Sequence, residues 1–440
     1  MLMSILLAAV NFVEINPGHF HAALVLNRSY PEANKEVRVY APAGPELDAH
    51  LALVNAFNTR EKDPTAWVEK VYRGDDFLAK AIESSSRGDV VILAGRNDLK
   101  PDYFLAAAKA GLHVISDKPM GIDDAAFAKL EETLRTAEKN GVIIDDVMTE
   151  RHEIFTIIQK ELVNSPIVYG EQLKGSPEEP AIEKLSVHHF CKLVNGKPLQ
   201  RPAWYYDVRK QGAGIADVTS HLVDIVQWSA FPGVKLKFDD VQVVSARAWD
   251  TPISAKEYKM STGLDKWPDY LLDKVDSSNT LQCEANGEFT YLLKGVAVKV
   301  AVEWRFIAES GSGDTHSSIM RGTRSTVSIR QNKETGFRPA LFVKCAPNVD
   351  RKVFEGALKA AVADIAKAYP GVKVGAEKDG EWRIVIPKSY DIGHEAHFSQ
   401  VTRNFLKYLA QGGLPAWEKP NMLVKYYTLT LAYKAAHGGK

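Results

Sequence analysis

VVILAGRNDLKPDYFLAAAKAGLHVISDKP, residues 90–119, is the stretch that decides the fold class. Asp89–Leu93 and His113–Ser116 have the apolar, β-branched character of buried strands. Between them, residues 102–110 read as an alanine-rich helix that ends at Gly111, a residue suited to the position after a helix. A strand, a helix and a second strand at this spacing predict a right-handed crossover between parallel strands.

The same alternation extends over the first 150 residues. Further strands are predicted over residues 12–16, 36–40 and 142–144, and further helices over residues 19–26, 46–57 and 123–140. Ligands of such a sheet bind beyond the carboxyl ends of its strands. We therefore predict a dinucleotide-binding domain over residues 1–150, with a doubly wound parallel sheet of the α/β Rossmann type.

Beyond residue 150 the pattern changes to segments that alternate apolar and polar residues, as in an antiparallel sheet with one solvated face. Strands are expected over residues 241–248, 280–283, 288–293, 297–306 and 325–329, and helices over 215–229, 350–369, 396–409 and 423–436. The chain of 440 residues also exceeds what one core usually serves. Residues 151–440 are therefore predicted to form a larger α+β domain with an open antiparallel sheet, for substrate binding and oligomerisation.

The charge balance limits the possible partners. Lysine plus arginine and aspartate plus glutamate each number 55, which argues against nucleic acid or an anionic membrane surface. Three scattered cysteines, Cys191, Cys283 and Cys345, have no metal-ligand spacing and are expected to be free thiols, so no metal is predicted. No stretch beyond the N-terminus is long and apolar enough to span a bilayer.

The first ten residues, MLMSILLAAV, resemble the apolar part of an export signal. No basic residue precedes them, however, and they pass directly into the first predicted strand. We expect an apolar extension of that strand and a cytoplasmic protein, with a periplasmic location as the alternative.

Two features at strand ends point to nucleotide chemistry. Residues 16–21 (NPGHFH) follow the first strand, where backbone N–H groups would face a pyrophosphate, although Gly18 alone remains of the usual glycine pattern. Lys118, fixed by Pro119, follows the strand 113–116 and would point into the cofactor crevice. There its ammonium could hold a substrate hydroxyl and lower the pKa of that oxygen. Taken singly, an ordinary turn and a solvated lysine are the better explanations of these two patterns.

A third feature lies in residues 212–224 (GAGIADVTSHLVD). The glycine pair is expected to open a helix on which Asp217, His221 and Asp224 recur at i, i+4 and i+7, so that they share one face. A carboxylate orients an imidazole and makes it more basic, which suits a base that takes a hydroxyl proton. A solvated pair on a surface helix is the alternative.

A fourth feature is residues 393–398 (GHEAHF). Here His394 and His397 are three residues apart, whereas metal-binding HExxH helices place them four apart. Capping and packing at a helix start, contact with substrate, and a metal site all remain open for this motif, which includes Glu395.

Together these motifs resemble the Gfo/Idh/MocA oxidoreductase family. Residues 90–119 are similar to its run from the third strand to an EKP motif, with Asp117 in place of the glutamate. Residues 212–224 resemble its glycine-rich turn and D-x-x-x-H helix. Phrases such as DDVMTER, SVHHFCK and RPAWYYDV look like a subgroup from carbohydrate-degrading bacteria with a distinctive C-terminal domain.

The resemblance implies NAD as cofactor, with NADP possible, because no acid ends the second strand to bind a ribose 2′-hydroxyl. A further departure is Lys100, where the family often has histidine. The cofactor-binding residues expected on this basis are Gly18, His19, Phe20, Asn97, Asp117, Lys118, Pro119 and Trp204.

The implied reaction is hydride transfer to or from a secondary hydroxyl of a sugar, glycoside or polyol. Lys118, Asp217 and His221 are the expected catalytic residues, with His221 as base, Asp217 as its orienting group and Lys118 on the reacting oxygen. A polar patch that includes His189 is also expected to reach the sugar, so the predicted substrate-binding residues are His188, Lys192, Asp217 and His221.

Two other functions use the same residues or fold. One is an NAD-dependent glycosidase or lyase that works through a transient 3-keto sugar and returns the cofactor unchanged. The other is a non-catalytic sensor of nucleotide or sugar. A small-molecule carbohydrate partner and a homo-oligomer, most simply a dimer, are expected, because strands between residues 241 and 329 carry apolar residues on both faces.

Overall fold

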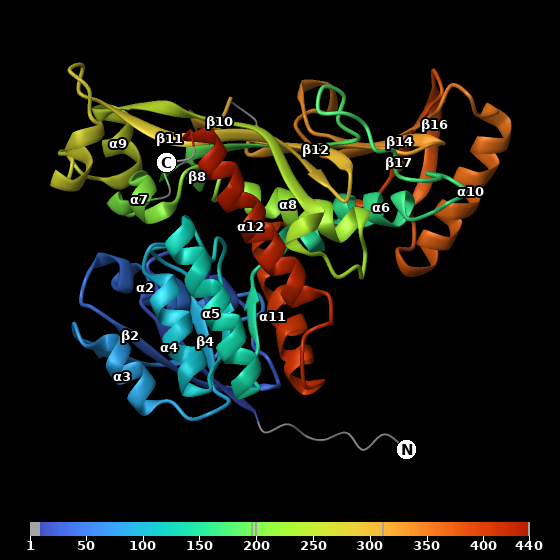
Figure 1. The fold of residues 1–440 in the computed structure, drawn as a ribbon. Coiled ribbons are helices and arrows are strands. Elements are labelled where there is room, and N and C mark those ends of the chain that lie inside the picture. Colours follow the sequence, from blue (N-terminus) through green and yellow to red (C-terminus); the bar gives the residue numbers. More distant parts are fainter. Residues whose placement is uncertain (1–8, 195–196, 199, 310–311, 439–440) are drawn as a thin grey trace, which may run out of the picture. The chain divides into compact units, whose positions relative to one another are not determined.

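A computed structural model describes residues 9–194, 197–198, 200–309 and 312–438, which divide into two compact units (Figure 1). The first comprises the described residues up to Thr149, with Arg209–Gly212 and Gly393–Tyr426. The second comprises Glu150–Val208, Ala213–Ile392 and the residues from Tyr427 onward. The strand extension expected over residues 1–8 lies outside the described residues. No helix in the described ranges is long and apolar enough to cross a membrane.

The first unit contains a parallel sheet with the strand order β3-β2-β1-β4-β5-β6, which confirms the predicted Rossmann architecture. Asp123 begins α5 by accepting a hydrogen bond from the backbone of Ala126, and α4 and α5 end at Gly111 and Gly141 in the left-handed region. The strands are β1 (Val10–Ile15), β2 (Ala33–Ala41), β3 (Val68–Arg73), β4 (Val90–Leu93), β5 (His113–Ser116) and β6 (Ile144–Asp146). The helices between them are α1 (His21–Val25), α2 (Pro45–Thr59), α3 (Phe77–Ser84), α4 (Lys100–Ala110) and α5 (Asp124–Asn140).

A late segment completes the core of this unit. Helix α11 (His394–Ala410) packs on α1, and its apolar side chains join those of β1, β2 and α2 in one buried cluster. The residues that α11 contributes are Phe398, Val401, Phe405, Leu406 and Leu409. The predicted first domain, residues 1–150, did not include this later segment, Gly393–Tyr426.

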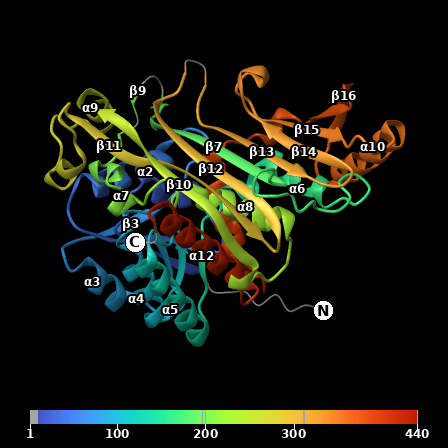
Figure 2. The ribbon, with the colours of Figure 1, turned by 45° about the horizontal axis from the view of Figure 1, so that its top comes forward.

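The second unit contains a nine-stranded sheet with the order β10-β11-β12-β7-β13-β14-β15-β17-β16 (Figure 2). The strands β12 and β7 pair in parallel and the other neighbours antiparallel, so the sheet is mixed and mostly antiparallel. Its strands are β7 (Ile182–Cys191), β10 (Val241–Ser254), β11 (Thr280–Leu293), β12 (Val296–Ile307), β13 (Thr315–Arg321), β14 (Ser325–Arg330), β15 (Ala340–Cys345), β16 (Lys373–Lys378) and β17 (Glu381–Val385). The remaining elements of this unit are a short hairpin of β8 (Leu193–Val194) and β9 (Lys197–Pro198), and the helices α6 (Ile154–Val163), α8 (Thr219–Ala230), α9 (Ala255–Thr262) and α10 (Arg351–Ala368). The helices α7 (Val208–Gln211) and α12 (Glu418–Ala436) have residues in both units.

Helix α8 begins four residues later than predicted, at Thr219 instead of Ile215. The backbone before Thr219 is hydrogen-bonded to β11, because the N–H of Gly214 donates to the carbonyl of Glu284 at 3.0 Å. A Cβ added at Gly214 would lie 1.8 Å from the carbonyl oxygen of Ala285. This close approach of two backbones explains the glycine and delays the helix, so Asp217 lies in the turn before α8.

Candidate functional site

The turn between β1 and α1 is held tightly against the end of β4. The N–H groups of Gly18 and His19 both donate to the carbonyl of Ala94, each at 3.1 Å. Asn16 has a positive φ of 49°, and a Cβ added at Gly95 would lie 2.7 Å from its carbonyl oxygen. A narrow turn at the carboxyl end of β1 is therefore built without the usual glycine pattern.

Two imidazoles of this turn face Asp117 at the end of β5. Asp117 Oδ2 lies 2.9 Å from His21 Nδ1 and 3.7 Å from His19 Nδ1. Burial alone would raise the pKa of Asp117, but His21, then Lys100 and His19, outweigh burial and hold that pKa well below its usual range. The three side chains place ligand atoms within 4.8 Å of one another, as do Glu14, His50 and Glu69 in the same unit.

A hydrogen bond from Lys100 holds the backbone next to Lys118. Lys100, almost fully buried on α4, donates from its ammonium to the backbone carbonyl of Asp117. Lys118 follows as a half-buried residue, and its bond to Pro119 is cis. The lysine found where the family often has histidine therefore supports the turn that carries the candidate catalytic lysine.

Asn97 and the motif at residues 393–398 have local partners in the first unit. Asn97 donates from its side-chain amide to the carbonyl of Gln211 at 2.6 Å. The ring of His394 lies 5.9 Å from that of His21, and the carbonyl of Glu395 accepts from Asn27 at 2.7 Å. The late motif thus starts α11 beside the β1–α1 turn.

The aspartates and the histidine predicted on one helical face belong to the second unit. Asp217 is buried before α8, and His221 is half-buried in its first turn. Asp224 forms two hydrogen bonds, of 2.6 and 2.7 Å, with the guanidinium of Arg151 in the short helix η1 (Thr149–His152). Arg151 therefore anchors α8 one turn beyond His221.

The predicted polar patch of His188, His189 and Lys192 converges on Asp314, which the sequence did not single out. The Asp314 carboxylate lies 3.2 Å from His188 Nδ1, 3.1 Å from His189 Nδ1 and 2.6 Å from Lys192 Nζ. Burial would raise the pKa of Asp314, but the hydrogen bonds of the two histidines and the charge of Lys192 lower it far below its usual range. Asp314 thus fixes the orientation of both imidazoles.

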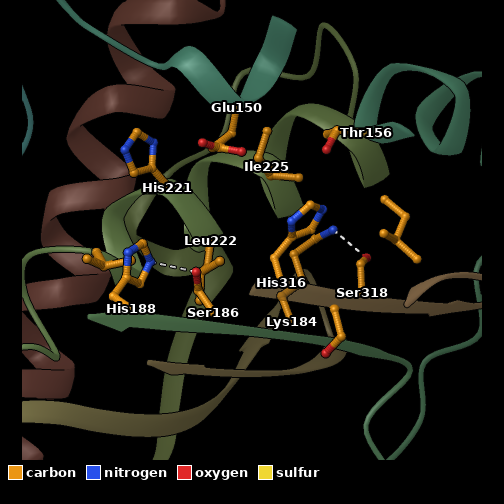
Figure 3. A pocket seen from close by; sticks show the side chains of 13 residues that line it. Glu150, Thr156, Lys184, Ser186, His188, His221, Leu222, Ile225, His316 and Ser318 are labelled. Carbon is orange, nitrogen blue, oxygen red and sulfur yellow. Dashed lines mark hydrogen bonds between the residues drawn. The ribbon is translucent and has the colours of Figure 1, made fainter. Parts of the chain in front are cut away.

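A pocket of the second unit brings His221 and His188 together (Figure 3). His188 Nε2 lies 2.7 Å from Ser186 Oγ, and the His188 ring stacks on Trp304 at 5.1 Å. The walls combine apolar side chains of α8 with polar side chains of η1, β7 and β13; those not yet named are Glu150, Thr156, Lys184, Val218, Leu222, Ile225, His316, Ser317, Ser318 and Ile329. Such a mixture of apolar surface and converging polar groups is typical of a small-molecule site.

Three of the predicted residues of the second unit, Lys192, Trp204 and Asp217, are not among the residues that line this pocket. Lys192 is a half-buried residue directly after β7, and its ammonium contacts Asp314, which in turn contacts His188 of the pocket lining. Trp204, in the short helix η2 (Ala203–Tyr206), is 7% exposed and belongs to an aromatic core with Tyr205 and Trp304. Trp204 is therefore part of the core that supports β7.

The sequence matches two family descriptions. Residues 33–145 match Gfo/Idh/MocA, described as "Oxidoreductase family, NAD-binding Rossmann fold", and residues 158–437 match "Putative oxidoreductase C terminal domain". Among the curated proteins, none matches the sequence.

Solved structures resemble the whole chain. A crystal structure of "a putative oxidoreductase from Parabacteroides merdae" is 48% identical over 98% of both chains, with a TM-score of 0.96. Levoglucosan dehydrogenase, in complex with NADH and levoglucosan, is 14% identical over 98% of both chains, with a TM-score of 0.62. A 3-ketoreductase from Actinomadura kijaniata, in complex with NADP, is 11% identical over 98% of this chain and 97% of the other, with a TM-score of 0.57. For levoglucosan dehydrogenase and the 3-ketoreductase, at 14% and 11% identity, the similarity shows a shared fold and nothing more specific.

Proposed function

The chain belongs to the Gfo/Idh/MocA oxidoreductase family and has its NAD-binding Rossmann domain, and from this premise we propose that it transfers a hydride to or from a secondary hydroxyl of a sugar, glycoside or polyol. The observation that supports the proposal most is the pocket, whose lining includes the imidazoles of His221 and His188 together with serine hydroxyls and the Lys184 ammonium. Levoglucosan dehydrogenase and the 3-ketoreductase, which share the fold, support a carbohydrate-related substrate.

His221 would act as the base. Its imidazole takes the hydroxyl proton as the carbinol carbon loses a hydride, which leaves a ketone. Asp217, buried directly before α8, would orient this imidazole, and Lys118 of the first unit would stabilise the charge that develops on the reacting oxygen. In the reverse direction the same groups protonate the alkoxide.

The first unit fits a dinucleotide at the carboxyl ends of β1, β4 and β5. The tight contact of Gly95 with Asn16 leaves no room for a Cβ, so the two loops that would flank the cofactor meet backbone to backbone. The residues proposed to hold the cofactor are Gly18, His19, Phe20, Asn97, Asp117, Lys118 and Pro119. A bound nicotinamide would supply the hydride acceptor or donor. Because β2 runs into Ala41-Pro42-Ala43-Gly44, both NAD and NADP belong in the test.

A panel of sugars and glycosides tests the proposal. Purified protein is incubated with NAD or NADP, while absorbance at 340 nm is followed and mass spectrometry measures the loss of two hydrogens from the sugar. Reduced cofactor and a keto sugar in equal amounts are expected. Release of an aglycone without net reduced cofactor would instead indicate the redox-neutral glycosidase or lyase, and binding without any turnover would indicate a sensor.

We also propose that the chain forms a homodimer through the nine-stranded sheet. Leu185 and Val187 of β7 and Ile319 of β13 are half-buried apolar residues on the face opposite Lys184, Ser186 and Ser318. Strand side chains alternate between faces, so these three residues share one surface. A second copy would cover that surface.

A further inference from the structure

The helix-covered face of the nine-stranded sheet carries a block of polar residues at its centre. Lys184, Ser186 and His188 alternate along β7 and therefore share a face. On the neighbouring strand β13, Ser318 lies opposite Lys184 and His316 lies opposite Ser186. A buried sheet face is normally apolar, so a cluster of this kind needs a chemical reason.

The strands on either side have the apolar residues that such a face normally carries. Val300 and Val302 of β12 pair with Lys184 and Ser186, and both valines are fully buried. On β14, Val327 and Ile329 are equally buried, and Ile329 pairs with Ser318. The polar block is thus confined to β7 and β13, where the pocket opens.

Lys184 is a buried cation with neutral hydrogen-bond partners. The residue is 5% exposed, and its ammonium donates to Ser318 Oγ at 2.7 Å and to Gln159 Oε1 at 3.4 Å. No carboxylate among the described residues lies within ion-pair distance of Lys184 Nζ. Burial lowers the pKa of Lys184 to about 7, so the charged form is unfavourable until an anion accompanies it.

A second buried polar atom lies beside this lysine (Figure 3). The Nε2 atom of His316 is buried, and no hydrogen-bond partner for it exists in the described part of the chain. Burial lowers the pKa of His316, so this ring is neutral near pH 7 and adds no second positive charge. Lys184 is thus the lysine of this pocket wall, with hydroxyl and imidazole groups around it, and the Glu150 carboxylate lines the same pocket.

We propose that the pocket binds a sugar acid or a glycoside of one, and that Lys184 pairs with the substrate carboxylate while Ser186 and Ser318 hydrogen-bond to its oxygens. This inference rests on the proposed function, because it places the carboxylate in the pocket that His221 lines. The carboxylate would give the buried Lys184 ammonium the anionic partner that its neutral hydrogen-bond partners do not supply.

Isothermal titration calorimetry on the full chain tests this inference without turnover. The matched probes are methyl β-D-glucopyranoside, methyl β-D-glucopyranosiduronate and methyl β-D-glucopyranoside 6-phosphate. We expect the uronate to bind at least about tenfold more tightly than the neutral glycoside, as suits a buried charge-assisted pair. Because part of Lys184 is neutral at pH 7.5, uronate binding should also take up protons, seen as different apparent enthalpies in phosphate and Tris buffers.

Two variants separate Lys184 from other lysines. Lys184→Met should abolish both the preference for the uronate and the proton uptake, while its unfolding temperature stays equal or rises because a buried charge is removed. Lys299→Met is the matched control, since Lys299 pairs with Glu288 on the outer face of neighbouring β12 and is 40% exposed. This control should keep the preference.

Equal affinity for uronate and glucoside, tighter binding of the phosphate, no binding of the uronate, or a preference that survives in Lys184→Met would each overturn the inference. Hydride transfer is read separately at 340 nm. A chain that prefers the uronate but transfers no hydride contradicts the proposed function alone, and a chain that oxidises neutral glycosides without such a preference contradicts the inference alone.

Discussion

Substitution of His221 tests the proposed chemistry most directly, because His221 is the residue proposed to take the proton of the substrate hydroxyl. His221→Ala should lower kcat by about two to four orders of magnitude, and Lys118→Ala should cost a similar factor. Nucleotide affinity, measured by fluorescence titration, should change little in both variants. His437→Gln is the control, since His437 pairs with Glu284 in the same unit outside the pocket. A His221→Ala variant with normal turnover would end the scheme.

His50 should make the first unit less stable at alkaline pH. His50 Nε2 lies 2.6 Å from Glu14 Oε2 and 3.3 Å from Glu69 Oε1. Burial alone would lower the pKa of His50, but the nearby carboxylates of Glu14 and Glu69 raise it from 6.5 to about 9. Because the pKa of His50 is higher in the folded state, protonation of His50 stabilises the folded protein fully below pH 6.5. This stabilisation is lost as the pH rises through 9, and the pKa shift corresponds to roughly 3 kcal/mol in the free energy of unfolding.

The urea midpoint of unfolding should therefore fall between pH 6.5 and pH 9.5. His50→Gln should lower the midpoint most at pH 6.5 and flatten its pH dependence. Part of the slope should remain, because the pKa of His437 is raised as well, through a backbone hydrogen bond and Glu284 that outweigh burial. An unchanged slope in His50→Gln would show that the buried cluster does not hold a proton.

Single residues could be predicted where a short motif marks a strand end. The prediction for Lys118 rests on such a motif, since the apolar strand before it and the proline after it are both visible in the sequence. Lys184 and Asp314 were not found, because their partners come from strand pairing across more than a hundred residues. A polar side chain on a buried strand face looks, in the sequence, like a solvated one.

Gly214 tests how the start of α8 is set. Gly214→Ala would place a Cβ against the backbone of β11, which cannot yield as a flexible side chain can. We expect a loss of about 1–3 kcal/mol in stability together with lower kcat, because the turn that carries Asp217 must move. The control is Gly356→Ala in α10, where a Cβ meets open space and alanine should stabilise the helix by about 0.5–1 kcal/mol. Thermal unfolding and kcat of both variants would check this, and a neutral Gly214→Ala would refute the proposed backbone contact.

Strands β3 and β7 were not predicted, for two different physical reasons. Strand β3 lies at the sheet edge with mostly exposed side chains, so its sequence VEKVYR lacks the apolar run of a buried strand. Strand β7 has lysine and serine on its covered face, which breaks the alternation that marked β12. The predicted strands at residues 280–283 and 288–293 form the single strand β11, whose middle contains Asn286 and Gly287 where the α8 turn docks.

For the whole molecule, the proposed dimer predicts a light-scattering mass of twice that of one chain at micromolar concentration. Leu185→Lys with Val187→Lys should give monomers, because two charges would be buried on the outer sheet face. Val353→Lys on α10 is the control, since Val353 is already 63% exposed. A monomer of the unaltered chain at high micromolar concentration would exclude the dimer.

The five apolar side chains that α11 adds to the first unit also fix an order of events during synthesis. Domains generally fold as they leave the ribosome, starting from the N-terminus. Here the Rossmann sheet emerges first, yet the groups that seal the α1 and α2 side of its core are among the last to be translated. That unsealed apolar surface stays uncovered while most of the second unit is made, so we expect the nascent chain to bind chaperones that recognise exposed apolar segments.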